Sequence, residues 1–151
     1  MKVTILIPSY EPEEKLVGYV DDLASRGFGR IVVVDDGSGE LYRGIFDRLD
    51  EKPFCTVLHH DVNKGKGAAL KTALNYIIEN RPDSVGAVTL DGDGQHLAKD
   101  VRNVAEKMLE TGKFVLGVRD FSLPSVPPKS RFGNRCSSIA LALCCGSYIS
   151  D

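Results

Sequence analysis

The feature that most constrains the fold is a regular alternation of two patterns along the chain. Short runs rich in Val, Ile and Leu alternate with longer segments in which apolar residues recur at helical spacing. The runs are nearly all apolar, which is typical of strands covered on both faces in a parallel sheet. This order predicts an α/β fold with an open, mostly parallel sheet and helices on both faces. The predicted strands are residues 3–7, 31–35, 55–60, 84–90 and 113–118.

Helical patterns fill the intervals between these runs. Residues 39–50 form a weaker helical pattern than the others. The chain has 151 residues and shows neither an internal repeat nor a linker, so we expect a single domain over residues 1–151. The apolar stripes lie within residues 16–24, 70–78 and 97–108, and one more lies within residues 136–144.

The composition argues against several classes of protein. Charged residues make up 26% of the chain and the net charge is −2, so nothing indicates a nucleic-acid-binding protein. No run reaches the roughly 18 apolar residues of a membrane-spanning helix. The first run stops at Pro8 and turns acidic, which is typical of a strand and not of a signal peptide. The four cysteines lack a C-x-x-C spacing, and Cys136, Cys144 and Cys145 fall in one apolar segment, where we expect buried thiols. A reduced, cytosolic compartment fits this cysteine usage best.

Polar and glycine-rich residues follow the predicted strands. The carboxyl ends of parallel strands share one edge of a sheet, and ligands of open α/β sheets bind beyond that edge. We therefore expect one binding site that combines acids, glycines and bases. Its candidate segments are Pro8-Ser9-Tyr10, Asp35-Asp36-Gly37-Ser38, residues 63–67, residues 91–96 and Arg119-Asp120.

The segment LDGDGQH, residues 90–96, is the strongest indication of a metal. Two acids one residue apart repel each other unless they share a cation. Oxygen ligands from Asp91, Asp93 and Gln95 suit Mg²⁺ or Mn²⁺ and leave coordination positions for a substrate diphosphate. Gly92 would let backbone and phosphate approach closely. The alternative is an ordinary surface turn that caps the next helix.

Two further segments have both a structural and a functional interpretation. Asp-Gly-Ser commonly closes a strand and starts a helix, with Ser38 as the N-cap, while a carboxylate here can also accept the ring N–H of a uracil or guanine base. Residues 63–67 lack the spacing of a phosphate-binding P-loop. Glycines and lysines before a helix can still meet phosphate, although a solvated helix start is the alternative.

The remaining candidates are basic residues and histidines. Loop 119–135 carries four cations that suit a diphosphate leaving group or a phosphate acceptor, with a solvated basic patch as the alternative. His59 and His60 close a strand without a spaced partner, so we predict structural roles for them. His96 is predicted to lie at a helix start, with a metal ligand or neither role as the alternatives.

Taken together, the motifs resemble a known family. The chain contains, in order, Ile-Pro-Ser-Tyr, Val-Val-Val-Asp-Asp-Gly-Ser, Asn-Lys-Gly-Lys-Gly-Ala-Ala, Asp-Gly-Asp-Gly-Gln-His and Arg-Asp followed by Ser-Arg-Phe-Gly-Asn. This series resembles the family 2 glycosyltransferases of GT-A fold, the nucleotide-diphosphosugar transferase type. The closest resemblance is to dolichyl-phosphate mannose synthases and bacterial polyprenyl-phosphate glycosyltransferases, and it covers essentially the whole chain.

The resemblance implies an inverting, metal-assisted glycosyltransferase. The donor would be a UDP- or GDP-linked sugar, the acceptor a polyprenyl (dolichyl-like) phosphate at the membrane surface, and the cofactor Mg²⁺ or Mn²⁺. The protein would be cytoplasmic and peripheral to the inner face of the membrane. The resemblance implies no nucleic-acid partner and no particular oligomeric state.

The resemblance also implies roles for individual residues on the donor side. Where the branch usually has Asn-Glu after the tyrosine, this chain has Glu11-Pro12. Pro8, Tyr10 and Asp36 would line the nucleoside pocket, with Asp35 beside them and Lys66 and Gly92 close to the nucleotide. Asp91 would face the ribose and metal, and Asp93 and Gln95 the metal and diphosphate.

On the acceptor side, Arg119 and Arg131 match basic positions near the donor phosphates or the acceptor phosphate. Family members continue with Asp-x-x-Ser/Thr-Gly-x-Arg, and Asp151 stands where that aspartate would begin. Asp93, Arg119, Arg131 and Asp151 are therefore the catalytic candidates. We expect residues 1–151 to be the donor-binding part of a GT-A-like domain without the acceptor part. The alternative function is a non-catalytic fragment that binds a nucleotide sugar.

Overall fold

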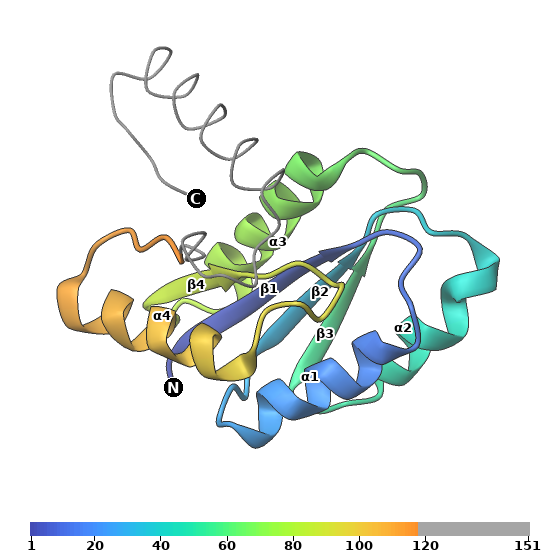
Figure 1. Ribbon diagram of the computed structural model, residues 1–151. Helices are drawn as coiled ribbons and strands as arrows, with labels where there is room; N and C mark the ends of the chain where they lie inside the picture. Colours follow the sequence, from blue (N-terminus) through green and yellow to red (C-terminus); the bar gives the residue numbers. More distant parts are fainter. Residues whose placement is uncertain (118–151) are drawn as a thin grey trace, which may run out of the picture. The chain divides into compact units, whose positions relative to one another are not determined.

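The computed structural model describes residues 1–117. Met1–Phe114 form one compact unit around a four-stranded sheet, in which all paired strands are parallel and the order is β3-β2-β1-β4 (Figure 1). The predicted open, parallel α/β sheet is thereby confirmed. The strands are β1 (Val3–Ser9), β2 (Ile31–Asp35), β3 (Cys55–His59) and β4 (Gly86–Thr89).

Helices cover both faces of this sheet, as predicted. Helices α1, α2 and α4 share one apolar cluster with one face, and α3 packs on the opposite face (Figure 1). The weak helical pattern over 39–50 is a 3₁₀ turn that leads into α2. The bounds are α1 (Lys15–Ser25), η1 (Glu40–Tyr42), α2 (Arg43–Asp50), α3 (Lys66–Asn80) and α4 (Ala98–Thr111).

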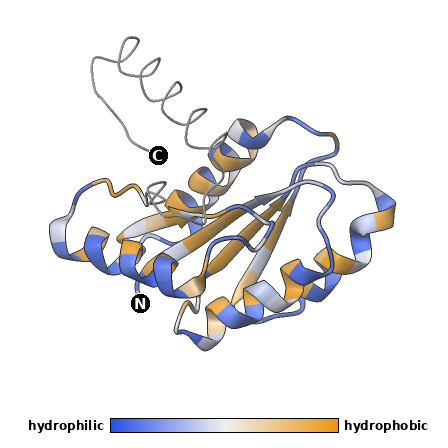
Figure 2. Cartoon of the chain, in the orientation of Figure 1, coloured by the Kyte–Doolittle hydropathy of each residue, from blue (hydrophilic) through white to orange (hydrophobic). Residues whose placement is uncertain are grey.

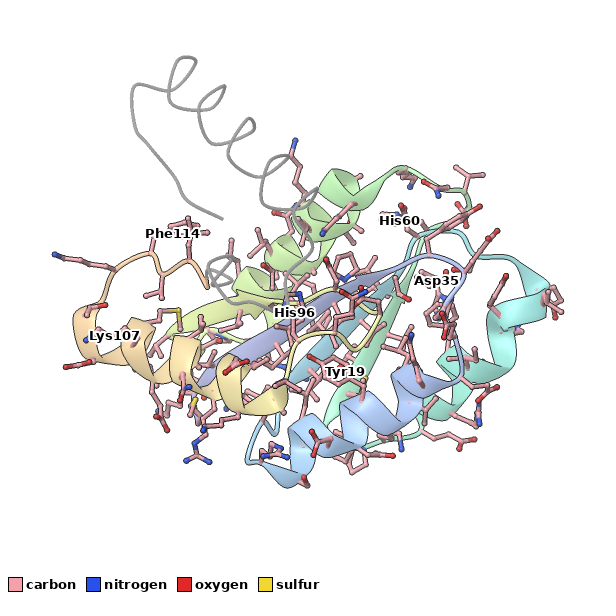
Figure 3. All side chains as sticks on the ribbon, viewed as in Figure 1. Tyr19, Asp35, His60, His96, Lys107 and Phe114 are labelled. Atoms are coloured by element: carbon pink, nitrogen blue, oxygen red, sulfur yellow. The ribbon has the colours of Figure 1, made fainter. Side chains whose placement is uncertain are left out.

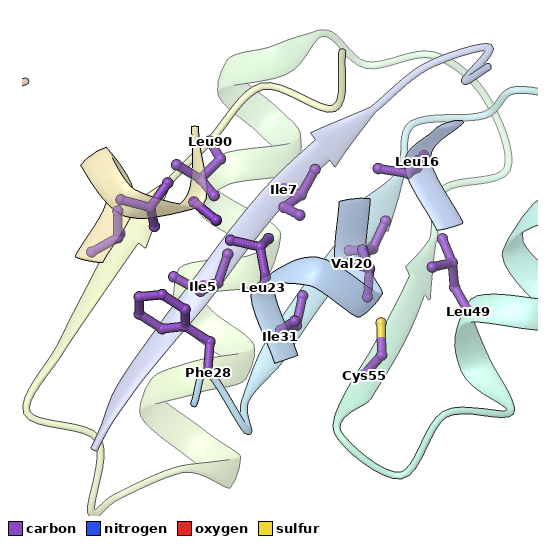
Figure 4. Packing of buried hydrophobic residues seen from close by; sticks show 14 of the residues in the cluster. Ile5, Ile7, Leu16, Val20, Leu23, Phe28, Ile31, Leu49, Cys55 and Leu90 are labelled. Carbon is purple, nitrogen blue, oxygen red and sulfur yellow. The ribbon is translucent and has the colours of Figure 1, made fainter. Parts of the chain in front are cut away.

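Strand β1 forms the centre of the core. Successive side chains of a strand point to opposite faces, so Ile5 and Ile7 pack toward α1 (Figure 4), while Leu6 packs toward α3. All three side chains are fully buried. Burial on both faces explains why the strands contain apolar residues almost without alternation, visible as the hydrophobic strands of Figure 2.

The opposite face is covered by α3 through small side chains. Ala69, Ala73 and Ile77 are buried against Leu6, Val32 and Val34 of the sheet. The apolar stripe predicted over 70–78 is therefore only partly correct in its orientation, because Leu74 and Ile78 are 41% and 74% exposed. Alanines let the helix approach the sheet closely, and this turns the larger neighbouring side chains outward.

One predicted strand is wrong within the described residues. Residues 113–117 form no strand, while position 118 and the remaining predicted elements lie outside the described residues. A strand is defined by ladder hydrogen bonds to a neighbour, and an apolar run carries no information about whether a neighbour is present.

Cys55 is a buried thiol. It lies at the start of β3 within the core, and burial, aided by the nearby charge of Asp50, raises the pKa of its thiol to about 12. Such a thiol is unreactive at neutral pH. Cys136, Cys144 and Cys145 lie outside the described residues.

The turn after β2 requires a glycine. Gly37 has φ +74°, and a Cβ there would stand 2.3 Å from the carbonyl carbon of Val62 and 2.5 Å from the nitrogen of Asn63. Only a residue without a side chain lets the two loops after β2 and β3 cross so closely. This crossing places the end of β2 beside residues 62–65.

We predict that Gly37→Ala destabilises the protein by at least about 3 kcal/mol, because a backbone clash is added to the strain of a positive φ. Gly112→Ala is the matched control. Its φ is +64° but nothing lies within 4 Å of the added Cβ, so it should cost only about 1 kcal/mol. Urea unfolding of both variants measures the difference, and equal losses would contradict the predicted clash.

Candidate functional site

The site lies at the carboxyl edge of the sheet, where the strand order reverses. Strands β2 and β3 lie on one side of β1 and β4 lies on the other, which leaves a crevice beyond the strand ends. A pocket of about 450 Å³ occupies this position. Of the predicted residues, it is lined by Pro8, Tyr10, Asp36, Lys66, Asp91, Gly92 and Asp93.

Asp36 is the buried acid of the pocket. Its Oδ1 accepts hydrogen bonds from the Nδ1 of His60 at 2.7 Å and from the backbone N–H of Lys64 at 2.9 Å. Burial alone would raise the pKa of Asp36, but the N–H groups of Lys64 and Gly65 together with His60 outweigh it and lower that pKa. Asp36 is therefore an ionised hydrogen-bond acceptor at neutral pH.

Asp35 and Ser38 have local structural contacts. Asp35 is buried outside the pocket lining, where its Oδ1 accepts the backbone N–H of Ser38 and its Oδ2 lies 3.0 Å from the Nδ1 of His59. The prediction that Ser38 is a helix N-cap is wrong, since Gly39 precedes η1. The Ser38 hydroxyl instead accepts the backbone N–H of Glu11, because the turn directs it toward the loop after β1.

The loop after β4 presents two carboxylates to the pocket. Asp91 forms an ion pair with Lys66, the first residue of α3, and both side chains are about half exposed. The Oδ1 of Asp93 accepts the backbone N–H of Gln95, which folds the loop into a tight turn. Gln95 itself does not line the pocket. The close approach of Gly92 to β1, with a Cβ position 3.4 Å from the Ser9 hydroxyl, brings this loop against the strand end.

The donor set of this loop fits a hard divalent cation that is shared with a substrate. Within residues 1–117, no group of three or more His, Cys, Asp or Glu side chains is arranged to hold a metal by itself. Mg²⁺ and Mn²⁺ are commonly held by one or two carboxylates together with substrate phosphates. Asp91 and Asp93, both in the pocket wall, offer that number of ligands.

Tyr19 of α1 holds the loop after β4 in place. Its hydroxyl donates a hydrogen bond to the backbone carbonyl of His96 at 2.8 Å, and its ring lies 3.9 Å from the Cβ position of Gly94 (Figure 3). Burial, with smaller contributions from Asp93 and Asp22, raises the pKa of Tyr19 to about 12, so the hydroxyl remains a donor. The sequence marks Tyr19 only as part of a helical pattern, so this role was not predicted.

Two further residues line the pocket. Asn63 belongs to the predicted segment 63–67, whereas no role was predicted for Lys15. Arg119, Arg131 and Asp151 lie outside the described residues. The geometry of the described part therefore concerns the donor side of the predicted site.

Comparison with known proteins identifies the family. The family model described as Glycosyl transferase family 2 matches residues 4–139, which is most of the chain. The chain belongs to glycosyl transferase family 2. This agrees with the resemblance found in the sequence motifs, and the fold is the α/β arrangement expected for it.

Three archaeal proteins are similar to this family 2 domain over 99% of its length. They are the uncharacterized protein MJ1222 of Methanocaldococcus jannaschii (30% identity), the UDP-N-acetylglucosamine--dolichyl-phosphate N-acetylglucosaminyltransferase of Methanococcus voltae (28%) and the glycosyltransferase AglJ of Haloferax volcanii (28%). The chain spans 61%, 65% and 47% of their respective lengths. In the described part of the chain, no helix has the length and apolar character needed to cross a membrane.

For this family 2 domain we predict that Tyr19→Phe loosens the loop after β4. Loss of the hydrogen bond to His96 should lower the free energy of unfolding by about 1 kcal/mol. It should also weaken Mn²⁺ binding, because Asp91 and Asp93 lose part of their support. Urea unfolding and calorimetric titration with Mn²⁺ test both effects. Tyr76→Phe, on α3 at the other face of the sheet, is the control; no difference between the two variants would contradict the role of Tyr19.

Proposed function

We propose that this chain binds the nucleotide-diphosphate sugar donor of a family 2 glycosyltransferase. The observation that carries the proposal is the content of one pocket: an ionised buried acceptor, a lysine at a helix start and two carboxylates that suit a divalent cation. These groups match, in order, the needs of a nucleobase, a phosphate group and a metal–diphosphate complex. The name of the Methanococcus relative supports a uridine nucleotide.

The base would lie at the Asp36 end of the pocket. A carboxylate that is already ionised accepts a ring N–H such as that of uracil or guanine. Tyr10, half exposed in the pocket wall, offers a ring face on which a base can stack. Pro8 adds a further apolar wall.

The diphosphate would lie at the other end, beside the loop after β4. Asp91 and Asp93 would hold Mg²⁺ or Mn²⁺, and the cation, when bound, would neutralise the diphosphate as it leaves. Lys66 adds a second positive charge at this end, next to the backbone N–H groups of the α3 start. Electrostatic stabilisation of the leaving group is the contribution expected from these side chains.

The complete reaction is proposed as transfer of the sugar, with inversion, to a polyprenyl or dolichyl-like phosphate at the inner face of the membrane. A phosphate acceptor is already a nucleophile, so positioning matters more than proton removal. Arg119, Arg131 and Asp151 remain the candidates for the acceptor side. The relative that is named for dolichyl phosphate supports this acceptor.

Calorimetric titration with UDP and GDP, with and without Mn²⁺, tests donor binding. We expect one of the two nucleotides to bind in a Mn²⁺-dependent manner and Asp93→Ala to weaken that binding by at least about tenfold, because a metal ligand is lost. Asp47→Ala, an exposed acid on α2 outside the pocket, removes the same charge and should leave binding unchanged. Absence of binding to both nucleotides by the folded chain would contradict the proposal.

Transfer is tested separately with UDP-N-acetylglucosamine and dolichyl phosphate in detergent. We expect a lipid-linked sugar with an inverted anomeric carbon, in an amount that depends on Mn²⁺ and falls in Asp93→Ala. Donor binding without any transfer would support the alternative of a non-catalytic binding fragment.

A further inference from the structure

A histidine behind the pocket is held at both ends of its ring. His60 follows β3, and its side chain is only 5% exposed. Its Nδ1 lies 2.7 Å from the Oδ1 of Asp36, and its Nε2 lies 2.9 Å from the hydroxyl of Thr72 on α3. Its backbone N–H is bonded to the carbonyl of Asp35. The ring is thus fixed between the site and a helix on the far face of the sheet.

The contact with Asp36 places a ring proton on Nδ1. The ionised carboxylate of Asp36 only accepts hydrogen bonds, so Nδ1 donates to it, while the Thr72 hydroxyl can donate to Nε2. Asp36 Oδ1 then has both of its lone pairs used, by His60 and by the N–H of Lys64. A hydrogen bond from a ligand in the pocket is therefore accepted by the other oxygen of Asp36, Oδ2.

The neighbouring histidine provides an internal comparison. His59 makes the same type of contact with Asp35, with its Nδ1 3.0 Å from Oδ2. Its side chain is 53% exposed, however, and Asp35 does not line the pocket. Two adjacent histidines thus contact two adjacent acids, and of the two acids only Asp36 lines the pocket.

We propose that His60 is a positioning residue that determines base selectivity by holding Asp36 as a pure hydrogen-bond acceptor with fixed orientation. The inference rests on the proposed function. A fixed acceptor accepts the N3–H of uracil or the N1–H of guanine and repels cytosine, whose N3 is itself an acceptor. Without His60, the carboxyl group of Asp36 can rotate or take up a proton and then tolerate cytosine.

The test compares the affinity of the full chain for CDP with that for UDP or GDP, whichever the wild-type chain binds, in the presence of Mn²⁺. In His60→Leu we expect the preference over CDP to fall about tenfold, because a hydrogen bond to a charged group is lost. His60→Asn can present an amide N–H near the place of Nδ1 and should keep the preference within about threefold of wild type. His59→Leu is the matched control and should keep it within about twofold.

Thermal unfolding verifies that each variant is folded, and Thr72→Val serves as a second variant if His60→Leu does not fold. Thr72→Val should lower the preference over CDP because the imidazole loses the contact at Nε2 that fixes its orientation. Equal losses of affinity for both nucleotides, or an unchanged preference in folded His60→Leu or Thr72→Val, would overturn the inference.

A second readout does not depend on the nucleotide. The ¹⁵N spectrum of the wild-type imidazole should show His60 protonated at Nδ1, and protonation at Nε2 alone would overturn the positioning contact. If the wild-type chain binds neither UDP nor GDP, the proposed function fails, and this spectrum still decides whether His60 donates to Asp36.

Discussion

The structure depends above all on the central position of β1 in a parallel sheet that is buried on both faces. Ile5 is paired with Ile31 of β2 on one side and with Val88 of β4 on the other. A slip by one residue would turn Ile5 away from α1 and expose the wrong side chains. Apolar packing therefore fixes the register, and the register brings the loops after β1, β2 and β4 to one edge. The position of the site therefore follows from the packing of the core.

The two ends of the pocket differ in rigidity, and this difference suits the binding of the base at one end and of the metal–diphosphate complex at the other. At one end Asp36 is buried and held by several hydrogen bonds, so its orientation is fixed. At the other end Lys66 and Asp91 form a half-exposed ion pair, which contributes little and is easily rearranged. A fixed acceptor suits a group that is read by directional hydrogen bonds. A rearrangeable pair suits a metal–diphosphate complex that enters and leaves.

The glycines of the site serve packing as well as ligand access. Gly37 lets the loop after β3 cross the turn after β2, and Gly92 lets the loop after β4 lie against β1. Without these close approaches the pocket walls would stand farther apart. Tyr19 completes the arrangement, because it attaches the loop after β4 to the helix that follows β1. The glycines of these motifs are therefore also required where two segments of the chain pack closely against each other.

The sequence by itself determined the alternation of strands and helices, four of the five expected strands, and the acids and glycines at the strand ends. These features are local in the sequence. Strands that are buried on both faces consist of consecutive apolar residues, which can be recognised without knowing their neighbours. Only the tertiary structure decided the strand order and which face of α3 is buried. It also decided that Asp36 lines the pocket while Asp35 does not, and that His60 contacts Asp36. Only the tertiary structure showed that residues 113–117, part of the strand expected at 113–118, form no strand. The physical reason is that each of these depends on a hydrogen bond or contact between residues distant in the chain, which no local pattern specifies.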